Sequence, residues 1–154
     1  MKITEFLEVK AIKLDLAAQE KTEILKELVD VLADVREIGD KKLIVKTLLE
    51  REALGSTGIG QGIAIPHGKT EKVKELVSVL AISKKGVNFE ALDGEPVYIF
   101  FLLVAPKDAA GPHLKALAQI SRLLRDTYFC DLLRRAETPE QVYELIHKEE
   151  SRKS

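Results

Sequence analysis

A histidine at the end of a short apolar run is the residue of this sequence best placed to do chemistry. Ile63, Ala64 and Ile65 form a run that is long enough for a buried strand. Pro66 ends the run because proline has no N–H to give to a sheet ladder, and His67 follows it directly. A neutral imidazole has a free lone pair and an ordinary pKa of about 6.5, so His67 is available as a nucleophile near neutral pH. The spacing alone also fits an ordinary core histidine after a strand end.

A loop rich in glycine and hydroxyl residues precedes this run. Gly58, Gly60 and Gly62 alternate, and glycine permits both positive φ and a close approach of the backbone to a ligand. Ser56 and Thr57 come just before them. Backbone N–H groups and hydroxyls in such a loop suit an anion, although turn formation is the commoner role of these residue types. We predict a phosphate-binding loop built from these five residues.

Two more residues are candidates for the same site. Arg51 lies sixteen residues before His67, in the last turn of an expected helix that ends at Gly55. A cation at that place also offsets the negative end of a helix, which is the alternative interpretation. His113 follows Pro112 at the start of another expected helix. The alternative for His113 is a first-turn residue that packs or faces water.

The string Gly-Gln-Gly-Ile-Ala-Ile-Pro-His-Gly at 60–68 resembles the active-site signature of phosphotransferase-system enzyme IIA proteins. The type is the fructose/mannitol one (type 2), which includes the nitrogen-regulatory branch. Glu52 fits the acidic or amide position that opens the signature, and Arg51 fits the family's active-site arginine. The segment 111–117, Gly-Pro-His-Leu-Lys-Ala-Leu, is similar to the family's second histidine segment. The resemblance runs over residues 10–146, almost the whole chain.

The resemblance implies a phosphoryl carrier whose His67 is phosphorylated, with Arg51 and His113 assisting. The implied donor is an HPr-like protein charged ultimately from phosphoenolpyruvate, and the implied acceptor is a IIB component of fructose/mannitol-type sugar uptake. The alternative is a nitrogen-regulatory protein, in which the phosphorylation state of His67 controls binding to regulatory partners without sugar transfer. Neither role requires a metal or nucleotide cofactor. A pure binding module, the third class, would accept no phosphate.

Composition restricts the class of protein further. The chain has 154 residues, which predicts one domain over residues 1–150 and a disordered tail at 151–154. A net charge of −1, from 24 basic and 25 acidic residues, argues against a nucleic-acid partner. One cysteine and a first segment without the apolar core of a signal peptide favour the cytoplasm. The longest apolar run, 97–105, is too short to span a bilayer, so we expect no direct membrane insertion.

The periodicity predicts an α/β fold, a mixed β-sheet covered by helices on both faces in a single compact domain. Strands are expected at 11–16, 63–65, 76–83 and 97–104, with a tight turn at Asp93-Gly94. Helices are expected at 19–36, 40–54, 112–126 and 128–136, and a capping box, Thr138-Pro-Glu-Gln, opens the last helix. The strands that precede His67 and His113 would bring both histidines to one edge of the sheet.

Rival motifs fit less well. The segment 68–70, Gly-Lys-Thr, looks like the end of a P-loop, but Ile63 stands where that motif needs its first glycine. The alternating glycines lack the Gly-x-Gly-x-x-Gly spacing of a dinucleotide site. Spacings of 46 and 34 residues between His67, His113 and His147 match no short metal motif. Cys130 has no phosphate-loop context and is expected to pack, and no Gly-x-Ser-x-Gly nucleophile elbow is present.

Overall fold

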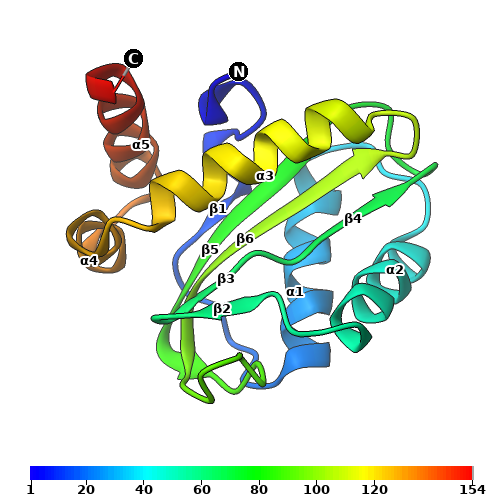
Figure 1. The fold of residues 1–154 in the computed structure, drawn as a ribbon, viewed down its shortest axis with the longest axis horizontal. Helices are drawn as coiled ribbons and strands as arrows, with labels where there is room; N and C mark the ends of the chain where they lie inside the picture. The colour runs from blue at the N-terminus through cyan, green and yellow to red at the C-terminus, as the bar shows by residue number, and fades with distance from the viewer. Residues whose placement is uncertain (154) are drawn as a thin grey trace.

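The computed structural model describes residues 1–153, with side chains through Arg152. Two short 3₁₀ helices, six strands and five α-helices follow one another along these residues (Figure 1). They are η1 (Ile3–Glu5), η2 (Val9–Ala11), β1 (Ile12–Lys13), α1 (Lys21–Val35), α2 (Lys41–Ala53), β2 (Gly58–Gly60), β3 (Ile63–Ala64), β4 (His67–Thr70), β5 (Val77–Val87), β6 (Val97–Pro106), α3 (Ala110–Leu124), α4 (Thr127–Arg135) and α5 (Pro139–Lys153).

The strands form one mixed sheet in the order β1-β5-β6-β3-β2, with β4 also paired to β6. β6 is the central strand, antiparallel to β5 and parallel to both β3 and β4. Every residue of 97–105 except Tyr98 is buried, as expected for a strand covered on both faces. β3 and β4 therefore follow one side of β6 as a single line that is interrupted at Ile65 and Pro66.

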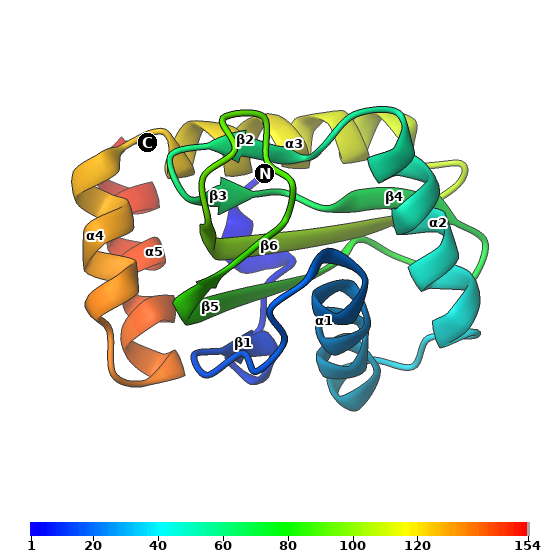
Figure 2. The ribbon, with the colours of Figure 1, turned by 90° about the horizontal axis from the view of Figure 1, so that it is seen from below.

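Helices cover both faces of this sheet, which confirms the predicted fold class. Figure 2 shows α3 on one face, α1 and α2 on the other, and α4 with α5 at one end of the sheet. α1 packs against β5, α2 against β4 and α3 against β6. The predicted caps of α2 are confirmed: the Asp40 carboxylate accepts the N–H of Leu43 at 3.2 Å, and Gly55 follows the last turn with φ +144°.

Two strands differ from their predicted lengths. β1 covers only Ile12–Lys13, because the 3₁₀ turn η2 takes up the residues just before it. β5 continues to Val87, through the Lys84-Lys85-Gly86 segment at which the sequence predicts its end. Gly86 has φ +88° and donates its N–H to Ser83 Oγ, so an irregularity absorbs this segment and Val87 still pairs with Val97.

Three further predictions are corrected at helix ends and after Pro66. α3 begins at Ala110 rather than Pro112, which costs nothing because the first N–H groups of a helix have no partner within it. The strand β4 after Pro66 was not predicted, because its own sequence has no strand pattern. It forms through pairing with β6. α5 continues through Lys153, supported by an Arg152–Glu149 ion pair of 2.9 Å, where the sequence predicts a disordered tail over residues 151–154. Ser154 lies outside the described residues.

Candidate functional site

His67 is held at the break between β3 and β4. Its Nδ1 lies 2.7 Å from the carbonyl oxygen of Ile65, and its backbone pairs with Leu103 of β6. The carbonyl of Pro66 accepts the N–H of Leu103 at 2.9 Å. Ile65 and Pro66 thus interrupt the strand, and pairing with β6 resumes at His67.

The hydrogen bond to Ile65 decides which nitrogen of His67 can react. A carbonyl oxygen only accepts, so Nδ1 carries the proton and Nε2 keeps its lone pair. Burial lowers the pKa of the His67 imidazole, the Ile65 hydrogen bond opposes this shift, and the charge of Arg51 adds to it. The ring is therefore neutral near pH 7 and presents Nε2 as its nucleophilic atom.

The ring of His113 lies beside the ring of His67. The two ring centroids lie 5.6 Å apart at 51° between planes, which confirms that the topology brings both histidines together. His113 stands in the first turn of α3, is 6% exposed, and its Nε2 is buried with no hydrogen-bond partner among residues 1–153. Burial lowers the pKa of His113, and the nearby His67 and Lys69 lower it further. A buried polar atom without a partner is costly, and this one points to a group that arrives from outside.

The position of Arg51 fits both interpretations of the sequence, a cation at a helix end and a residue of the site. Its Nη1 donates to the carbonyl oxygen of Gly55 at 2.8 Å, just beyond the end of α2. Its charge also acts on His67, and both side chains line the same surface cavity. A guanidinium has five N–H donors, so the bond to Gly55 fixes one edge and leaves others for a ligand.

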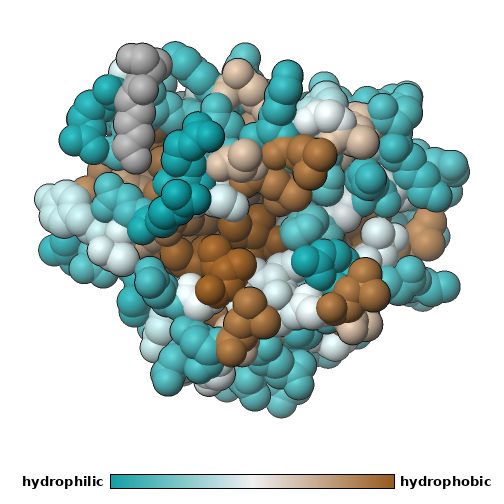
Figure 3. All heavy atoms as spheres, in the orientation of Figure 1, coloured by the Kyte–Doolittle hydropathy of each residue, from teal (hydrophilic) through white to brown (hydrophobic). Residues whose placement is uncertain are grey.

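The cavity that contains these three residues has a volume of about 650 Å³. It is lined by Thr47, Glu50, Arg51, Leu54, His67, Gly68, Lys69, Lys107, His113, Leu114 and Leu117. Three of these residues are cationic and one is anionic, so the cavity favours an anionic ligand. Leu54 and Leu114 stand at 85% and 67% exposure beside it. Figure 3 shows further hydrophobic residues gathered along α3 and over the strands beside it.

Lys69, Lys107 and the leucines were not among the residues that the sequence singled out. Lys69 lies two positions after His67, and residues two apart in a strand point to the same face. A strand prediction over 67–70 would have placed Lys69 beside His67, but the sequence indicates no strand there. Lys107 follows the end of β6, where only the parallel pairing of β4 and β6 places it near Lys69.

Ser56 and Thr57, two of the predicted phosphate-loop residues, do not line the cavity. The Ser56 hydroxyl accepts the N–H of Gly58 at 3.0 Å. Thr57 is buried, and both its N–H and its hydroxyl donate to the carboxylate of Glu52. These contacts organise the loop itself.

Gly58, Gly60 and Gly62 lie in the β2–β3 hairpin and do not line the cavity either. Gly62 has φ +81°, and its carbonyl accepts the N–H groups of Tyr98 and Ile99 at the start of β6. Leu103, the partner of His67, is farther along that strand. A phosphate-binding role for these glycines stays a prediction; the positive φ of Gly60 and Gly62 and the close approach of Ala91 to Gly58 already favour glycine at each position.

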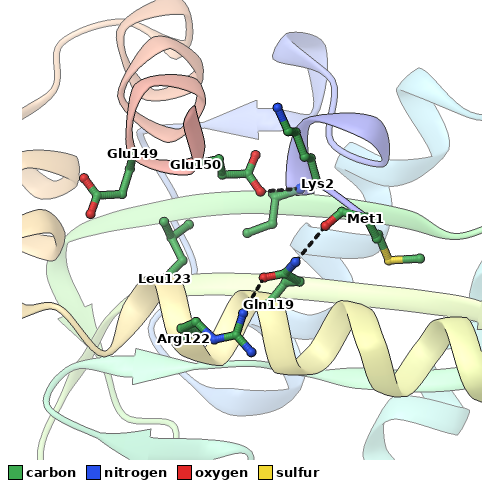
Figure 4. A pocket seen from close by; sticks show the side chains of 8 residues that line it. Met1, Lys2, Gln119, Arg122, Leu123, Glu149 and Glu150 are labelled. Atoms are coloured by element: carbon green, nitrogen blue, oxygen red, sulfur yellow. Dashed lines mark hydrogen bonds between the residues drawn. The ribbon is translucent and has the colours of Figure 1, made fainter. Parts of the chain in front are cut away.

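A second cavity, of about 320 Å³, lies at the amino terminus and has a structural explanation (Figure 4). Gln119 donates to the Met1 carbonyl at 2.7 Å, and the Glu150 carboxylate accepts the N–H of Ile3 at 2.6 Å. These side chains hold the first residues of the chain against α3 and α5.

Within the described chain, no three His, Cys, Asp or Glu side chains gather in the manner of a metal site. Each helix there is too short or too polar to cross a membrane.

Comparison with known proteins decides the family. The family described as "Phosphoenolpyruvate-dependent sugar phosphotransferase system, EIIA 2" matches residues 5–149. The chain belongs to this family.

Relatives of this enzyme IIA chain carry two kinds of name. A nitrogen regulatory protein of Bradyrhizobium diazoefficiens is 38% identical over 146 residues, which are 95% of this chain and 95% of that protein.

The fructose-specific EIIABC component of Bacillus subtilis is also 38% identical, over 148 residues. The alignment covers 96% of this enzyme IIA chain but only 23% of the Bacillus protein. Among solved structures, the nitrogen regulatory protein IIA-Ntr of Neisseria meningitidis has a TM-score of 0.86 at 31% identity, covering 94% of this chain and 98% of that one. A complex of the mannitol enzyme IIA with phosphorylated enzyme IIB from Escherichia coli has a TM-score of 0.78 at 21% identity, covering 93% and 99%, and shows the same fold.

Proposed function

We propose that this chain is a histidine phosphoryl carrier in which Nε2 of His67 accepts the phosphoryl group. The observation that carries the proposal is the 2.7 Å contact between His67 Nδ1 and the Ile65 carbonyl, which leaves Nε2 as the free nucleophile in a cationic cavity. The donor is an HPr-like protein that carries phosphohistidine. In the transfer, a bond forms between Nε2 and phosphorus while the phosphorus–nitrogen bond of the donor breaks and its electron pair returns to the donor ring.

The cations of the cavity stabilise the phosphoryl group during this transfer. Phosphoryl transfer needs in-line positioning and compensation of the negative charge on the equatorial oxygens. Arg51 supplies a planar fork whose orientation the Gly55 bond fixes, and Lys69 and Lys107 add positive charge. The Ile65 carbonyl keeps its hydrogen bond to Nδ1 while the ring gains positive character, so it stabilises the phosphorylated state as well.

His113 assists without carrying phosphate. Its buried Nε2 lacks a partner, and its ring lies 5.6 Å from that of His67. Because its pKa is lowered, the ring is neutral and has one N–H to donate. A phosphoryl oxygen on His67 provides the acceptor that this N–H otherwise lacks.

The acceptor is either a IIB component of fructose/mannitol-type sugar uptake or a regulatory target. The fructose-specific relative and the nitrogen regulatory relative are both 38% identical to this chain, so identity supports the two roles equally. The Escherichia coli complex joins a related fold to a phosphorylated enzyme IIB. We infer that partner proteins dock over the cavity, where Leu54 and Leu114 give apolar contact around the charged site.

The proposal is tested with phosphoenolpyruvate, enzyme I and an HPr-like protein carrying labelled phosphate. The chain should take up one phosphate that is labile in acid and stable in alkali, as expected for phosphohistidine. His67→Ala should abolish the label, while His147→Ala, which changes an exposed histidine of α5, should leave it intact. Stoichiometric labelling of His67→Ala would contradict the assignment. Adding candidate IIB proteins to the labelled chain then separates the two roles, since only a sugar carrier should discharge to them.

A further inference from the structure

An ion pair between a buried carboxylate and a partly buried lysine lies outside the cavity, and its carboxylate is connected to His67 by hydrogen bonds. Glu52 is 7% exposed, and Oε1 of its carboxylate lies 3.0 Å from Nζ of Lys21, the first residue of α1. Lys21 is held in turn by Phe89, whose ring centroid lies 4.9 Å from Nζ, and by Glu90 at 3.8 Å. Buried ion pairs are weak sources of net stability, so this pair calls for another reason.

The first connection leads from Glu52 to the ring of His67. Both oxygens of the carboxylate lie 3.2 Å from the N–H nitrogen of Thr57, whose hydroxyl also donates to it. The Thr57 carbonyl then accepts the N–H of Ile65 at 3.0 Å, and the Ile65 carbonyl accepts Nδ1–H of His67 at 2.7 Å. Four residues thus link the buried carboxylate to the nitrogen that sets the tautomer of His67.

Pro66 explains why this connection matters. The peptide bond between Ile65 and Pro66 has no N–H, so it cannot be anchored through a donor of its own. The carbonyl that orients His67 belongs to this peptide, and Ile65 is instead held on its other side, through the N–H that Thr57 accepts. Thr57 therefore helps to set the position of the His67 ring, together with the pairing of Pro66 and His67 with Leu103 of β6.

The second connection leads from Glu52 to Arg51. The backbone carbonyl of Glu52 accepts the N–H of Gly55 at 3.0 Å, which closes the last turn of α2. The carbonyl of Gly55 then accepts Nη1 of Arg51 at 2.8 Å. This second connection runs through the main chain of Glu52, so only the connection to His67 depends on the Glu52 side chain.

We propose that Lys21 and Glu52 are positioning residues whose side chains hold the ring of His67 in the placement that phosphoryl transfer requires. The inference rests on the proposed function, because it assigns a role in that reaction. Neither side chain lines the cavity, so they act through Thr57 and Ile65, and the charge of Glu52 also raises the pKa of His67. The Lys21 ammonium lies 3.0 Å from the Glu52 carboxylate, which accepts both donors of Thr57.

Glu52→Gln tests the proposal, because the amide keeps the shape but loses the ion pair and one acceptor. We expect the rate of His67 phosphorylation, measured in a single turnover with phosphorylated donor, to fall by about 10- to 100-fold in the folded variant, the size that a small misplacement of reacting groups causes. ¹⁵N NMR of the ring should show that the Nδ1–H tautomer of His67 loses population to the Nε2–H tautomer. A contribution to stability alone would lower the melting temperature and leave the tautomer unchanged.

Glu27→Gln is a matched control. Glu27 accepts the backbone N–H groups of Ala17 and Ala18 and lies 3.2 Å from Lys13, so it has the same kinds of partner as Glu52. It neither lines the cavity nor contacts Thr57 or Gly55. Its rate of phosphorylation and its His67 tautomer should equal those of the parent.

Thr57→Val is a milder variant that keeps the test decisive if Glu52→Gln does not fold. It removes only the hydroxyl donor to Glu52 and should shift the rate and the tautomer in the same direction by a smaller factor. Parent values of both quantities in a folded Glu52→Gln or Thr57→Val protein would overturn the proposal. If the parent takes up no phosphate at all, the proposed function fails, and the His67 tautomer alone then decides whether Glu52 positions the ring.

Discussion

At the scale of single residues, Arg51 shows why charge alone is an incomplete description of the site. A cation in the last turn of a helix needs no fixed orientation to interact favourably with the helix end. Arg51 is instead oriented by a defined hydrogen bond to Gly55, and the same side chain lines the cavity beside His67. The planar shape of guanidinium lets one residue perform both tasks at once.

Arg51→Lys should separate these two tasks. Lysine keeps the positive charge but lacks the fork that holds Gly55 and phosphoryl oxygens in one geometry. We expect the single-turnover rate of His67 phosphorylation to fall by about 10- to 100-fold, whereas the free energy of unfolding should change by less than about 1 kcal/mol. Arg122→Lys, on an exposed arginine of α3 outside the cavity, is the control. Equal rates for Arg51→Lys and the parent would reduce Arg51 to its role at the helix end.

The direction of the His67 pKa shift predicts the pH dependence of transfer. The nucleophile must be neutral, and burial lowers the pKa of His67 below its ordinary value of about 6.5. As pH falls, the rate of phosphoryl acceptance should therefore decline with a midpoint below the ordinary value of about 6.5. Rates measured with donor phosphorylated beforehand, together with an NMR titration of the His67 ring, check this expectation. A rate midpoint at or above the ordinary value would show that burial does not control the nucleophile.

At the scale of elements, the first turn of α3 carries a polar atom whose loss of hydration is not offset by a hydrogen bond within the described residues. Nε2 of His113 is buried without a partner among the described residues. Such an atom destabilises by about 1–3 kcal/mol. If His113 assists the transfer as proposed, this site keeps a functional group at the expense of stability.

His113→Leu should consequently lower activity without lowering stability. The side chains are of similar size, and leucine has no polar atom to leave unpaired. We expect the free energy of unfolding to stay equal or rise by about 1 kcal/mol, while His67 still takes up phosphate at a reduced rate. Denaturant unfolding and single-turnover labelling measure the two quantities. Unchanged transfer kinetics would leave His113 without a role in the reaction, and label on the peptide that contains His113 would make it a carrier.

The β2–β3 hairpin provides the opposite case, in which stability should fall and transfer should not. A Cβ at Gly62 would lie 3.2 Å from Cδ2 of Tyr98, and φ of +81° disfavours any other residue. Gly62→Ala should therefore cost about 1 kcal/mol or more of unfolding free energy, with the rate of His67 phosphorylation unchanged in the folded protein. A rate that falls in the folded variant would support the predicted phosphate-binding loop. Gly111→Ala, where a Cβ meets open space, is the control.

At the scale of the whole molecule, the sequence predicts what depends on local pattern. The caps of α2, the buried strand β6 and the covered sheet all follow from periodicity and end signals. The shared location of His67 and His113 follows from the ends of two neighbouring strands, and the distance of 5.6 Å between their rings confirms it. The sequence signals for each of these elements lie within short segments of the chain.

The features that the sequence did not predict depend on distant partners. β4 has the sequence His-Gly-Lys-Thr, which carries no apolar alternation and exists as a strand because β6 pairs with it. The glycines at 58, 60 and 62 suit a hairpin as well as an anion, and the residues that would crowd a Cβ there, Ala91, Asp93 and Tyr98, lie about 30 positions farther along the chain. Lys107 enters the site through the end of β6 for the same reason.

The last prediction concerns the face of the molecule on which a partner protein must dock. Leu54 directly follows α2 and Leu114 lies in α3, helices on opposite faces of the sheet, and both leucines line the cavity that contains His67. Exposed leucines beside a charged site give apolar contact that a small ligand does not need and a protein partner does. Leu54→Ser with Leu114→Ser should raise KM for the phosphorylated donor by about tenfold or more, with little change in stability because both side chains already face water.

Leu92→Ser is the matched control for this double variant. Leu92 is 73% exposed, close to the value of Leu114, but lies in the loop before β6 and does not line the cavity. Steady-state labelling at varied donor concentration should leave its KM at the parent value, because hydrophobicity as such is not what the donor recognises. A KM that rises equally in Leu92→Ser and in the double variant would place donor docking elsewhere. A KM unchanged in both would mean that the charged residues of the cavity suffice for recognition.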